Sequence, residues 1–278
     1  MILKVSELSD LDRLFLVERH LVSREHMLTP NERGVVISDR EIISLMINEE
    51  DHLRFQVLQS GFNLTEAWAM LKQVDQELEQ SLSYAFMPSW GYLTACPTNV
   101  GTGMRASCML HLPSLVMTKQ ISRVIHAISK LGLTARGFYG EGTEAVGNFF
   151  QLSNQVSIGV GEEEILDNLE RLITQVVEQE LAARSALLNQ SKQALEDRIF
   201  RAYGTLKSAH LISSKETIDL LSTVRLGVDL GLLPDLHPEQ INRLLIQIQP
   251  AHLQKLAGKV LTVPERDSRR ADLLRETL

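Results

Sequence analysis

The first 160 residues mix short strand-like runs with helix-like patterns of apolar residues. The run from Ile42 to Ile47 is short, branched and largely apolar, which predicts a buried strand. A helix is predicted to follow it, opened by Asn63 and Glu66 at the spacing of a capping box. Its apolar positions recur every three or four residues, at Trp68, Leu71, Val74, Leu78 and Leu82.

The same mixture continues toward residue 160. Apolar residues alternate over 108–112, which predicts a strand. A helical pattern then ends at Gly132, a residue typical of a C-cap. The apolar positions of this helix are Ile121, Val124, Ile125, Ile128 and Leu131. Two more strands are predicted, around 133–138 and 148–152. Because strands and helices are interspersed without regular alternation, the pattern predicts an α+β fold rather than a doubly wound sheet.

The chain changes character after residue 160. A long amphipathic helix is predicted, with glutamates at 162–164 near the positive end of its dipole. Its apolar positions are Ile165, Leu166, Leu169, Leu172, Ile173, Val176, Val177 and Leu181. From about Arg184 onward no strand pattern recurs, and Pro238 is typical of the first residue of a helix. We therefore expect a mixed domain over 1–183 and an all-helical domain over 184–278.

Composition supports a folded chain with two domains. The length of 278 residues is near twice that of a usual domain. Hydrophobic residues make up 44% and charged residues 23%, a balance that excludes intrinsic disorder. A net charge of −7 disfavours a general nucleic-acid surface, and an aromatic content of 5% disfavours a platform for stacking bases. We expect no nucleic-acid partner.

The two cysteines and the distribution of charged residues indicate where in the cell the protein is found. Cys96 and Cys108 are too few for a disulfide framework or a four-cysteine zinc site, so a reducing compartment is expected. One long stretch, 81–104, contains no Asp, Glu, Lys, Arg or His, but two prolines and three glycines interrupt it. Such a stretch cannot form a membrane-spanning helix. Early charges, such as Lys4, also disfavour a signal peptide. We expect a cytoplasmic protein without a membrane partner.

Three segments contain residues that a reaction could use: Asn48–Arg54, Cys96–Arg105 and Arg136–Gly142. Each segment also has an ordinary structural explanation. Charged turns commonly end strands, a lone cysteine beside a proline is usually packed, and a glycine-flanked arginine and glutamate can form a surface turn. The Gly-Thr-Gly at 101–103 matches neither a dinucleotide-binding fingerprint nor a P-loop, because its spacing differs and no lysine follows.

Taken together and in this order, the three segments resemble the phosphagen (ATP:guanido) kinases. Residues 96–105 are similar to the active-site cysteine signature of this family, and residues 48–54 to its acidic motif. Within the family the sequence resembles the bacterial protein-arginine kinases, on the basis of Tyr139–Gly142 and of an RDxxRA motif at Arg266–Ala271. The resemblance implies an antiparallel-rich sheet flanked by helices, followed by the helical domain. It also implies transfer of the γ-phosphate of MgATP to protein arginine.

By this resemblance, Glu50, Glu141 and Cys96 are the catalytic residues. An arginine guanidinium stays protonated at ordinary pH and is a poor nucleophile. It needs carboxylates that fix its planar fork and accept its proton. Glu50 and Glu141 would be this pair, with Glu50 as the base. Cys96 would act as a thiolate that polarises the guanidinium, stabilised by neighbouring arginines and Thr98.

The resemblance further implies an ATP site rich in arginine, because cations stabilise the charge on the phosphoryl oxygens during transfer. Arg54, Arg105 and Arg136 are expected to bind the phosphates, and His20 is expected on the adenine or ribose side. The remaining expected ATP contacts are Ala106, Ser107, Cys108, Met109, Gly137, Phe138, Tyr139, Gly140 and Glu141. Mg²⁺ is expected to arrive with ATP and to be held by phosphates and water, without a protein ligand.

The C-terminal motif has two interpretations. Arg266–Ala271 is typical of a solvated helix face with local ion pairs. By resemblance, Arg266, Asp267, Arg270 and Ala271 instead sense phosphoarginine, whose phosphoryl end is anionic. The resemblance also implies protein substrates with exposed arginines, an ATP-dependent protease chaperone, an activator protein, a heat-shock repressor and a homodimer.

One part of the family pattern does not occur in the sequence. Family members carry an upstream Ser-Ser-Arg-x-Arg-type motif whose arginines grip the nucleotide phosphates, and these 278 residues contain no equivalent. We therefore expect a truncated or mis-started member with weaker transition-state stabilisation. Two alternatives to a protein-arginine kinase stay open at this point: a catalytically impaired phosphoarginine-binding adaptor, and a kinase for free guanidino metabolites.

Overall fold

The computed structural model describes residues 1–29, 32–137 and 146–278. The chain packs into two compact units. The first consists of Met1–Cys108 and Ser153–Leu172, and the second of Met109–Leu152 and Ile173–Leu278. Sheets flanked by helices in one part of the sequence and helices alone in another confirm the α+β expectation. The division into domains at 183/184 stays a prediction.

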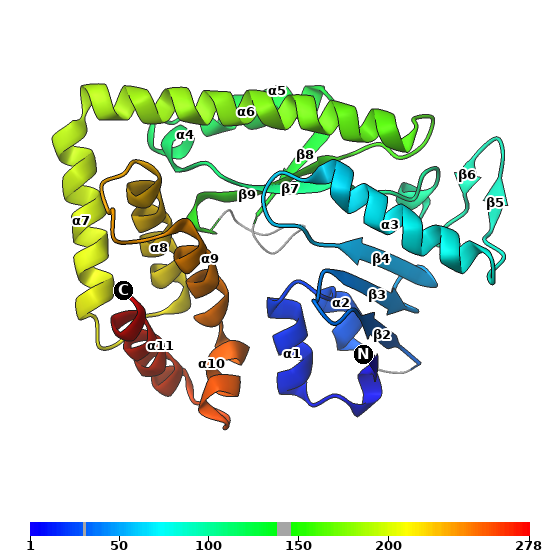
Figure 1. Cartoon of the computed structure of the whole chain (residues 1–278), viewed down its shortest axis with the longest axis horizontal. Coiled ribbons are helices and arrows are strands. Elements are labelled where there is room, and N and C mark those ends of the chain that lie inside the picture. Colours follow the sequence, from blue (N-terminus) through cyan, green and yellow to red (C-terminus); the bar gives the residue numbers. More distant parts are fainter. Residues whose placement is uncertain (30–31, 138–145) are drawn as a thin grey trace. The chain divides into compact units, whose positions relative to one another are not determined.

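The first unit is built on a four-stranded antiparallel sheet in the order β1-β2-β3-β4 (Figure 1). The strands are β1 (Ile2–Lys4), β2 (Gly34–Ile37), β3 (Ile43–Ile47) and β4 (Leu53–Val57). The strand predicted at 42–47 is confirmed as β3, which pairs with β2 on one side and with β4 on the other. Its buried and half-buried residues alternate, as expected for a strand with one face on a core.

Short helices cover one face of this sheet. They are the 3₁₀ helix η1 (Val5–Glu7), α1 (Asp10–Glu18) and α2 (Arg24–Leu28). Ser9 and Ser23 cap α1 and α2, because each hydroxyl accepts a backbone N–H from the first helical turn, at 3.2 and 3.0 Å. The core between helices and sheet consists of Val5, Leu16, Leu21, Val22, Met27, Val35, Ile37 and Met46.

Helix α3 (Leu64–Glu79) packs along β4, as Figure 1 shows. Asn63 is its N-cap residue, but the predicted capping box is wrong: the Asn63 side chain caps no backbone N–H and instead donates to the carbonyl of Ser60 at 2.8 Å. A hairpin of β5 (Phe86–Met87) and β6 (Gly91–Tyr92) follows, and then the 3₁₀ helix η2 (Pro97–Asn99).

A second sheet has the strand order β7-β9-β8. It consists of β7 (Ser107–His111), β8 (Leu133–Arg136) and β9 (Phe149–Asn154), with α4 (Pro113–Met117), α5 (Ile121–Lys130) and the 3₁₀ helix η3 (Val146–Asn148) in the connections. The three predicted strands and the predicted helix at 121–131 are therefore confirmed. Gly132 follows α5 with φ +84°, which confirms the predicted left-handed C-terminal glycine.

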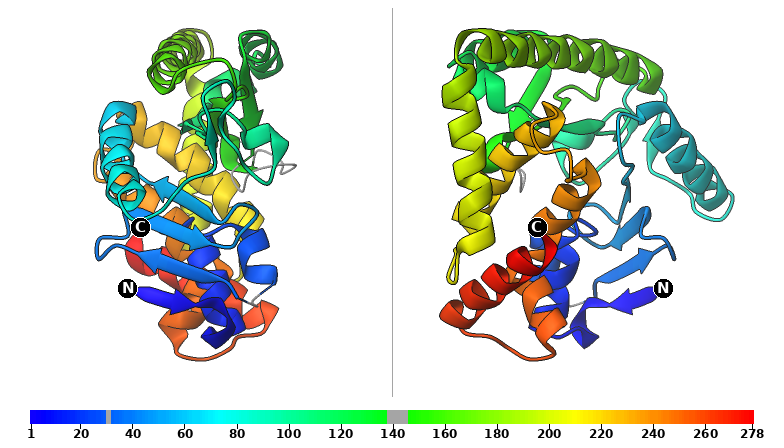
Figure 2. Two further views of the ribbon diagram at one scale, coloured as in Figure 1. Left: turned by 90° about the vertical axis from the view of Figure 1, so that its right-hand side faces the viewer. Right: turned by 60° about the vertical axis from the view of Figure 1, so that its left-hand side comes forward.

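From residue 162 on, every element that the structure describes is a helix, as predicted (Figure 2). These helices are α6 (Glu162–Gln190), α7 (Lys192–Ser208), α8 (Ser214–Asp229), α9 (Pro238–Gln247), α10 (Pro250–Ala257) and α11 (Val263–Thr277). Pro238 is the first residue of α9, as expected. The core of the second unit includes Ile199, Leu206, Leu221, Val224, Ile241, Leu244 and Leu274. The longest described helix, α6, carries charged residues along its length, and none of the described helices could cross a bilayer.

Within the second unit, a buried carboxylate ties α6 to α4. The two oxygens of Glu180 accept the backbone N–H groups of Ser114 and Leu115 at 3.0 and 2.9 Å. These N–H groups belong to the first turn of α4, where a helix has no internal acceptors for them. Arg184 also donates to Glu180, at 2.9 Å, so the buried charge is paired.

Candidate active site

The acidic segment forms the turn between β3 and β4. Asn48 adopts a left-handed conformation, with φ +59°, and its N–H donates to the carbonyl of His52 at 2.9 Å. Consecutive residues of the turn face different surroundings. The side chain of Glu49 is only 6% exposed, whereas Glu50, the predicted base, is exposed and accessible to a substrate.

Glu49 fixes the position of Arg54, one of the predicted phosphate-binding residues. Glu49 Oε1 accepts a hydrogen bond from Ser23 Oγ at 2.7 Å and one from Arg54 Nη1 at 3.1 Å. Burial alone would raise the pKa of Glu49. The hydrogen bonds from Ser23 and from the Glu50 N–H, together with the charge of Arg54, outweigh burial and lower the pKa of Glu49 below its ordinary value. Glu49 therefore stays ionised and holds the guanidinium of Arg54.

Asp51 joins the acidic turn to the cysteine loop, which we define as residues 94–105. One carboxylate oxygen accepts the N–H of Ala95 at 2.6 Å, and the other accepts Asn99 Nδ2 at 2.9 Å. These partners flank Cys96 and lie 44 and 48 residues from Asp51 in sequence. The structure thus brings together the first two segments singled out in the sequence. Sequence analysis gave Asp51 no role of its own.

Cys96 is half-buried at the start of η2. Its Sγ lies 3.0 Å from Thr98 Oγ1, so the predicted neighbour of the sulfur is in contact with it. The backbone carbonyl of Cys96 accepts a hydrogen bond from Thr94 Oγ1 at 2.7 Å, which orders the residues before η2.

Close packing between two backbones supports the far side of the cysteine loop. Gly101 has φ +112°, and a Cβ at this position would lie 2.1 Å from the backbone oxygen of Ser157. Only glycine can therefore occupy this site. Ser157 also donates from its hydroxyl to the carbonyls of Val100 and Thr98, at 2.9 and 3.1 Å. Two independent contacts thus hold the loop against the segment after β9.

Asn154, at the end of β9, fixes the backbone on both sides of Arg105. Its Nδ2 donates to the carbonyl of Met104 at 3.0 Å, and its Oδ1 accepts the N–H of Ala106 at 2.8 Å. Arg105 is exposed between these two anchored residues. Sequence analysis missed both Asn154 and Ser157, because neither lies in a motif and no periodicity marks them.

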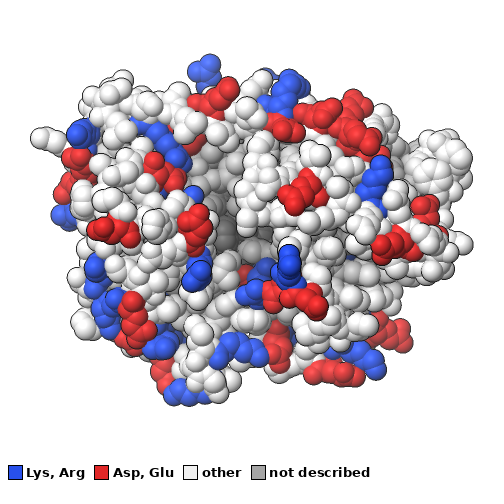
Figure 3. Space-filling view, in the orientation of Figure 1, with Lys and Arg blue, Asp and Glu red and all other residues white. Residues whose placement is uncertain are grey.

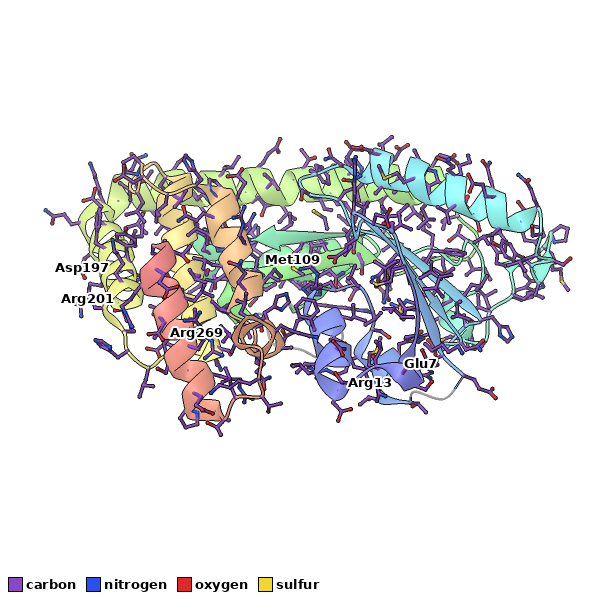
Figure 4. The ribbon with its side chains drawn as sticks, turned by 60° about the horizontal axis from the view of Figure 1, so that its bottom comes forward. Glu7, Arg13, Met109, Asp197, Arg201 and Arg269 are labelled. Atoms are coloured by element: carbon purple, nitrogen blue, oxygen red, sulfur yellow. The ribbon has the colours of Figure 1, made fainter. Side chains whose placement is uncertain are left out.

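The other expected ATP contacts are distributed over both units. Ala106 precedes β7, and Ser107, Cys108 and Met109 lie within it; Figure 4 labels Met109, which is 38% exposed. Burial raises the pKa of the Cys108 thiol to about 11, so this second cysteine stays protonated. Burial lowers the pKa of His20, whose neutral ring suits a nucleoside better than a phosphate.

The third predicted segment lies largely outside the described residues. Arg136 is the last residue of β8, and the buried Gly137 follows it; both belong to the second unit. Phe138, Tyr139, Gly140 and Glu141 fall in the part that the structure does not describe. Among the described residues, no group of three His, Cys, Asp or Glu side chains could hold a metal ion.

The C-terminal motif lies on α11. Arg270 is 1% exposed and donates to the backbone carbonyls of Ile248 and Ile212 at 2.9 and 2.8 Å, and it pairs with Asp267 at 2.5 Å. Ala271 is fully buried, and Arg266 donates to the carbonyl of Leu261 at 3.3 Å.

Arg269, which Figure 4 labels, lies between these motif residues. It forms a long ion pair with Glu276, at 3.9 Å. In this structure Arg270 thus helps to hold the helical unit together, and its role in sensing phosphoarginine stays a prediction.

Comparison with known proteins agrees with this site. The model of the ATP:guanido phosphotransferase C-terminal catalytic domain matches residues 1–183, and that of the protein-arginine kinase McsB C-terminal domain matches residues 192–278. The protein-arginine kinase of Desulforamulus reducens is 53% identical over 99% of this chain and 77% of its own length. That of Brevibacillus brevis is 51% identical over 100% of this chain and 78% of its own length.

Solved structures support the same assignment. A lombricine kinase aligns with a TM-score of 0.58 and 25% identity over 67% of this chain and 55% of its own. The duplicated taurocyamine kinase of Schistosoma mansoni aligns with a TM-score of 0.60 over 84% of this chain and 40% of its own, and at 23% identity it supports the fold alone. The chain therefore belongs to the ATP:guanido phosphotransferase family and carries the C-terminal domain of protein-arginine kinases, as the resemblance in its sequence implied.

Proposed function

We propose that this protein transfers the γ-phosphoryl group of MgATP to the guanidinium of arginine residues in other proteins. The observation that carries the proposal is the pair of hydrogen bonds from Ala95 and Asn99 to Asp51, which holds the exposed Glu50 beside the loop of Cys96. The relatives described above, named protein-arginine kinase and about half identical over nearly the whole chain, support arginine in proteins as the acceptor.

In this reaction a bond forms between a guanidinium nitrogen and the γ-phosphorus. The bond from the γ-phosphorus to the bridging oxygen breaks, and ADP leaves. The proton of the attacking nitrogen passes to the Glu50 carboxylate, which is accessible to the substrate. Cys96, as a thiolate, contacts the guanidinium and increases its polarisation, and Glu141 is the second carboxylate that fixes the planar fork.

The nucleotide is bound through its charge. Arg54, Arg105 and Arg136 bind the phosphates, and they offset the charge that develops on the phosphoryl oxygens. His20 contacts the adenine or the ribose, and residues 106–109 and 137–141 line the nucleotide. Mg²⁺ enters with ATP and is held by phosphate oxygens and water.

The purified protein, γ-labelled ATP and an unfolded casein-like substrate test this function. We expect label that is stable in base but lost in acid, because a P–N bond hydrolyses in acid and phosphoserine does not. Glu50→Gln removes the base and is expected to abolish the label. Glu163→Gln, at an exposed position of α6, is the matched control and retains it. Absence of acid-labile label with the unmodified protein contradicts the proposal.

We further propose that residues 1–183 form the catalytic domain and residues 184–278 a regulatory domain. There Arg266, Asp267, Arg270 and Ala271 sense phosphoarginine. The partners are protein substrates, an ATP-dependent protease chaperone, an activator protein and a heat-shock repressor, and the protein forms a homodimer in the cytoplasm. Free phosphoarginine is then expected to alter the kinase rate, and Arg266→Ala to remove that response.

A further inference from the structure

The hairpin β5–β6 and its flanks expose apolar side chains that the proposed reaction does not use. The exposed residues, which we call the hairpin surface, are Leu82 (42%), Phe86 (55%), Met87 (44%), Trp90 (54%) and Leu93 (44%). Single exposed apolar residues are common, but here five of them lie within 12 residues of the chain, on one hairpin and its flanks. Trp, Phe and Met are also the side chains enriched where proteins bind one another.

The hairpin surface carries no charge. No Asp, Glu, Lys, Arg or His occurs between Ser81 and Met104, so no charged side chain of the hairpin or its flanks interrupts this surface. The corresponding end in Figure 3, at the right where Figure 1 places β5 and β6, is largely white. An uncharged strip of this kind favours apolar side chains of a partner.

The hairpin surface is continuous with the cysteine loop. Tyr92 of β6 donates its N–H to the carbonyl of Gly101 at 2.7 Å, and Gly101 donates back to Tyr92 at 3.2 Å. The Tyr92 ring packs edge-on against Phe86, with ring centroids 5.2 Å apart, and against Tyr84 at 6.0 Å. These contacts fix the hairpin on the loop that contains Cys96.

Acidic residues border the hairpin surface on the side of α3. This helix contains four acidic residues and one lysine. Burial and the nearby carboxylate of Asp75 raise the pKa of Tyr84 to about 12. Burial, Asp75 and Glu79 likewise raise the pKa of Tyr92, and Glu79 is the last residue of α3, three residues before Leu82. A chain that combines apolar residues with arginine is complementary to this surface, whereas an acidic chain is repelled.

We propose that the hairpin surface docks apolar residues that lie close in sequence to the target arginine, in an extended segment of the protein substrate. Trp90 and Cys96 are six residues apart, so an extended chain spans at most about 20 Å between them. A substrate segment of about six residues reaches over the same span. The kinase then selects arginines within unfolded, apolar-rich segments. This inference rests on the proposed function and names its substrate class.

Two peptides test the preference. One is a Gly-Ser peptide with a single arginine, and the other is identical except for two leucines within six residues of the arginine. We expect kcat/KM to be about tenfold higher for the leucine peptide. Trp90→Ser and Met87→Ser are expected to bring the ratio close to one without changing kcat/KM for the Gly-Ser peptide. Leu28→Ser, at a 74% exposed apolar position on α2, is the matched control and keeps the ratio.

An equal kcat/KM for the two peptides with the unmodified protein overturns the inference, and so does an unchanged ratio in the hairpin variants. A second readout is independent of catalysis. Trp68→Phe leaves Trp90 as the sole tryptophan, since the chain has two. The leucine peptide, without ATP, is expected to shift Trp90 emission to shorter wavelength, and the Gly-Ser peptide is not.

These readouts separate the two proposals. A fluorescence shift without phosphorylation of either peptide supports docking and contradicts the proposed function. Phosphorylation of both peptides without a shift supports the function and overturns docking. A shift that grows with protein concentration in the absence of peptide indicates that a second copy of the chain covers the hairpin, which also overturns the inference.

Discussion

Removal of the Asp51 carboxylate is expected to impair activity more than stability. Asp51→Ala eliminates the hydrogen bonds to Ala95 and Asn99 that join the acidic turn to the cysteine loop. A hydrogen bond to a charged group contributes about 1.5–3 kcal/mol, so two contribute about 3–6 kcal/mol. Asp51 is only half-buried, so in the variant water can replace the carboxylate as acceptor and recover part of this free energy. About 2–3 kcal/mol then remains as the contribution of Asp51 to ordering the loop. At about 1.36 kcal/mol per tenfold, kcat/KM falls roughly 100-fold.

Asp51→Asn makes the measurement sharper. The asparagine keeps one oxygen acceptor but replaces the other with an NH₂ group, which cannot accept from a second donor. It also removes the charge. We therefore expect kcat/KM to fall roughly tenfold in Asp51→Asn, less than in Asp51→Ala. The assay is kcat/KM for arginine phosphorylation of a fixed peptide, with Asp39→Ala, an exposed residue between β2 and β3, as the control that leaves it unchanged.

Thermal unfolding is followed by circular dichroism on the same samples. The sheet β1–β4 and its core do not depend on the Asp51 hydrogen bonds, so the melting temperature is expected to fall by only a few degrees. Two outcomes contradict the reasoning. One is an Asp51→Ala variant with undiminished kcat/KM; the other is a loss fully explained by unfolding at the assay temperature.

Three further predictions follow from the packing. Gly101→Ala places a Cβ 2.1 Å from a backbone oxygen and is expected to lower kcat/KM at least tenfold. The control is Gly103→Ala, where the nearest atom to the added Cβ is 3.8 Å away. It is expected to lower the free energy of unfolding by roughly 1 kcal/mol, because its φ is positive, and to leave kcat/KM nearly unchanged. Burial raises the pKa of Cys108 to about 11, so iodoacetamide at pH 8 should label Cys96 first, and mass spectrometry should detect labelled Cys108 only as the pH approaches 11. Glu180→Ala leaves the buried N–H groups of Ser114 and Leu115 without an acceptor, whereas Arg184 keeps its ion pair with Asp229 at 3.1 Å. Urea denaturation should report a loss of about 2–4 kcal/mol in the free energy of unfolding.

The elements that sequence analysis predicted are those with a strong internal pattern. α5 and α6 repeat apolar residues at helical spacing, β3 is a short run of mostly branched apolar residues, and the structure confirms all three. β1 has only three residues, and its pairing with β2 defines it more than its own composition does. Short strands of this kind are specified by long-range pairing, so a local pattern cannot identify them.

The residues of the candidate site likewise fall into two groups, those that a sequence motif identifies and those that only the structure reveals. Glu50, Cys96 and Arg54 were found because their segments carry recognisable motifs. Asp51 and Asn154 fix the geometry of those segments through hydrogen bonds across 44 to 50 residues of sequence. Aspartate and asparagine are common in any loop, and nothing local distinguishes a side chain that ties two loops together from one that faces water.

Arg270 is a motif residue whose burial in the structure changes how its motif is interpreted. The sequence allowed a solvated helix face or a phosphoarginine sensor, yet the structure buries Arg270 against two backbone carbonyls and Asp267. A buried guanidinium that satisfies carbonyls contributes to folding, so its loss can abolish sensing without any role in recognition. Arg266 is more exposed and donates to one carbonyl, at 3.3 Å. A regulatory defect in Arg266→Ala would therefore implicate the motif in sensing, whereas the same defect in Arg270→Ala would first require proof that the helical unit is still folded.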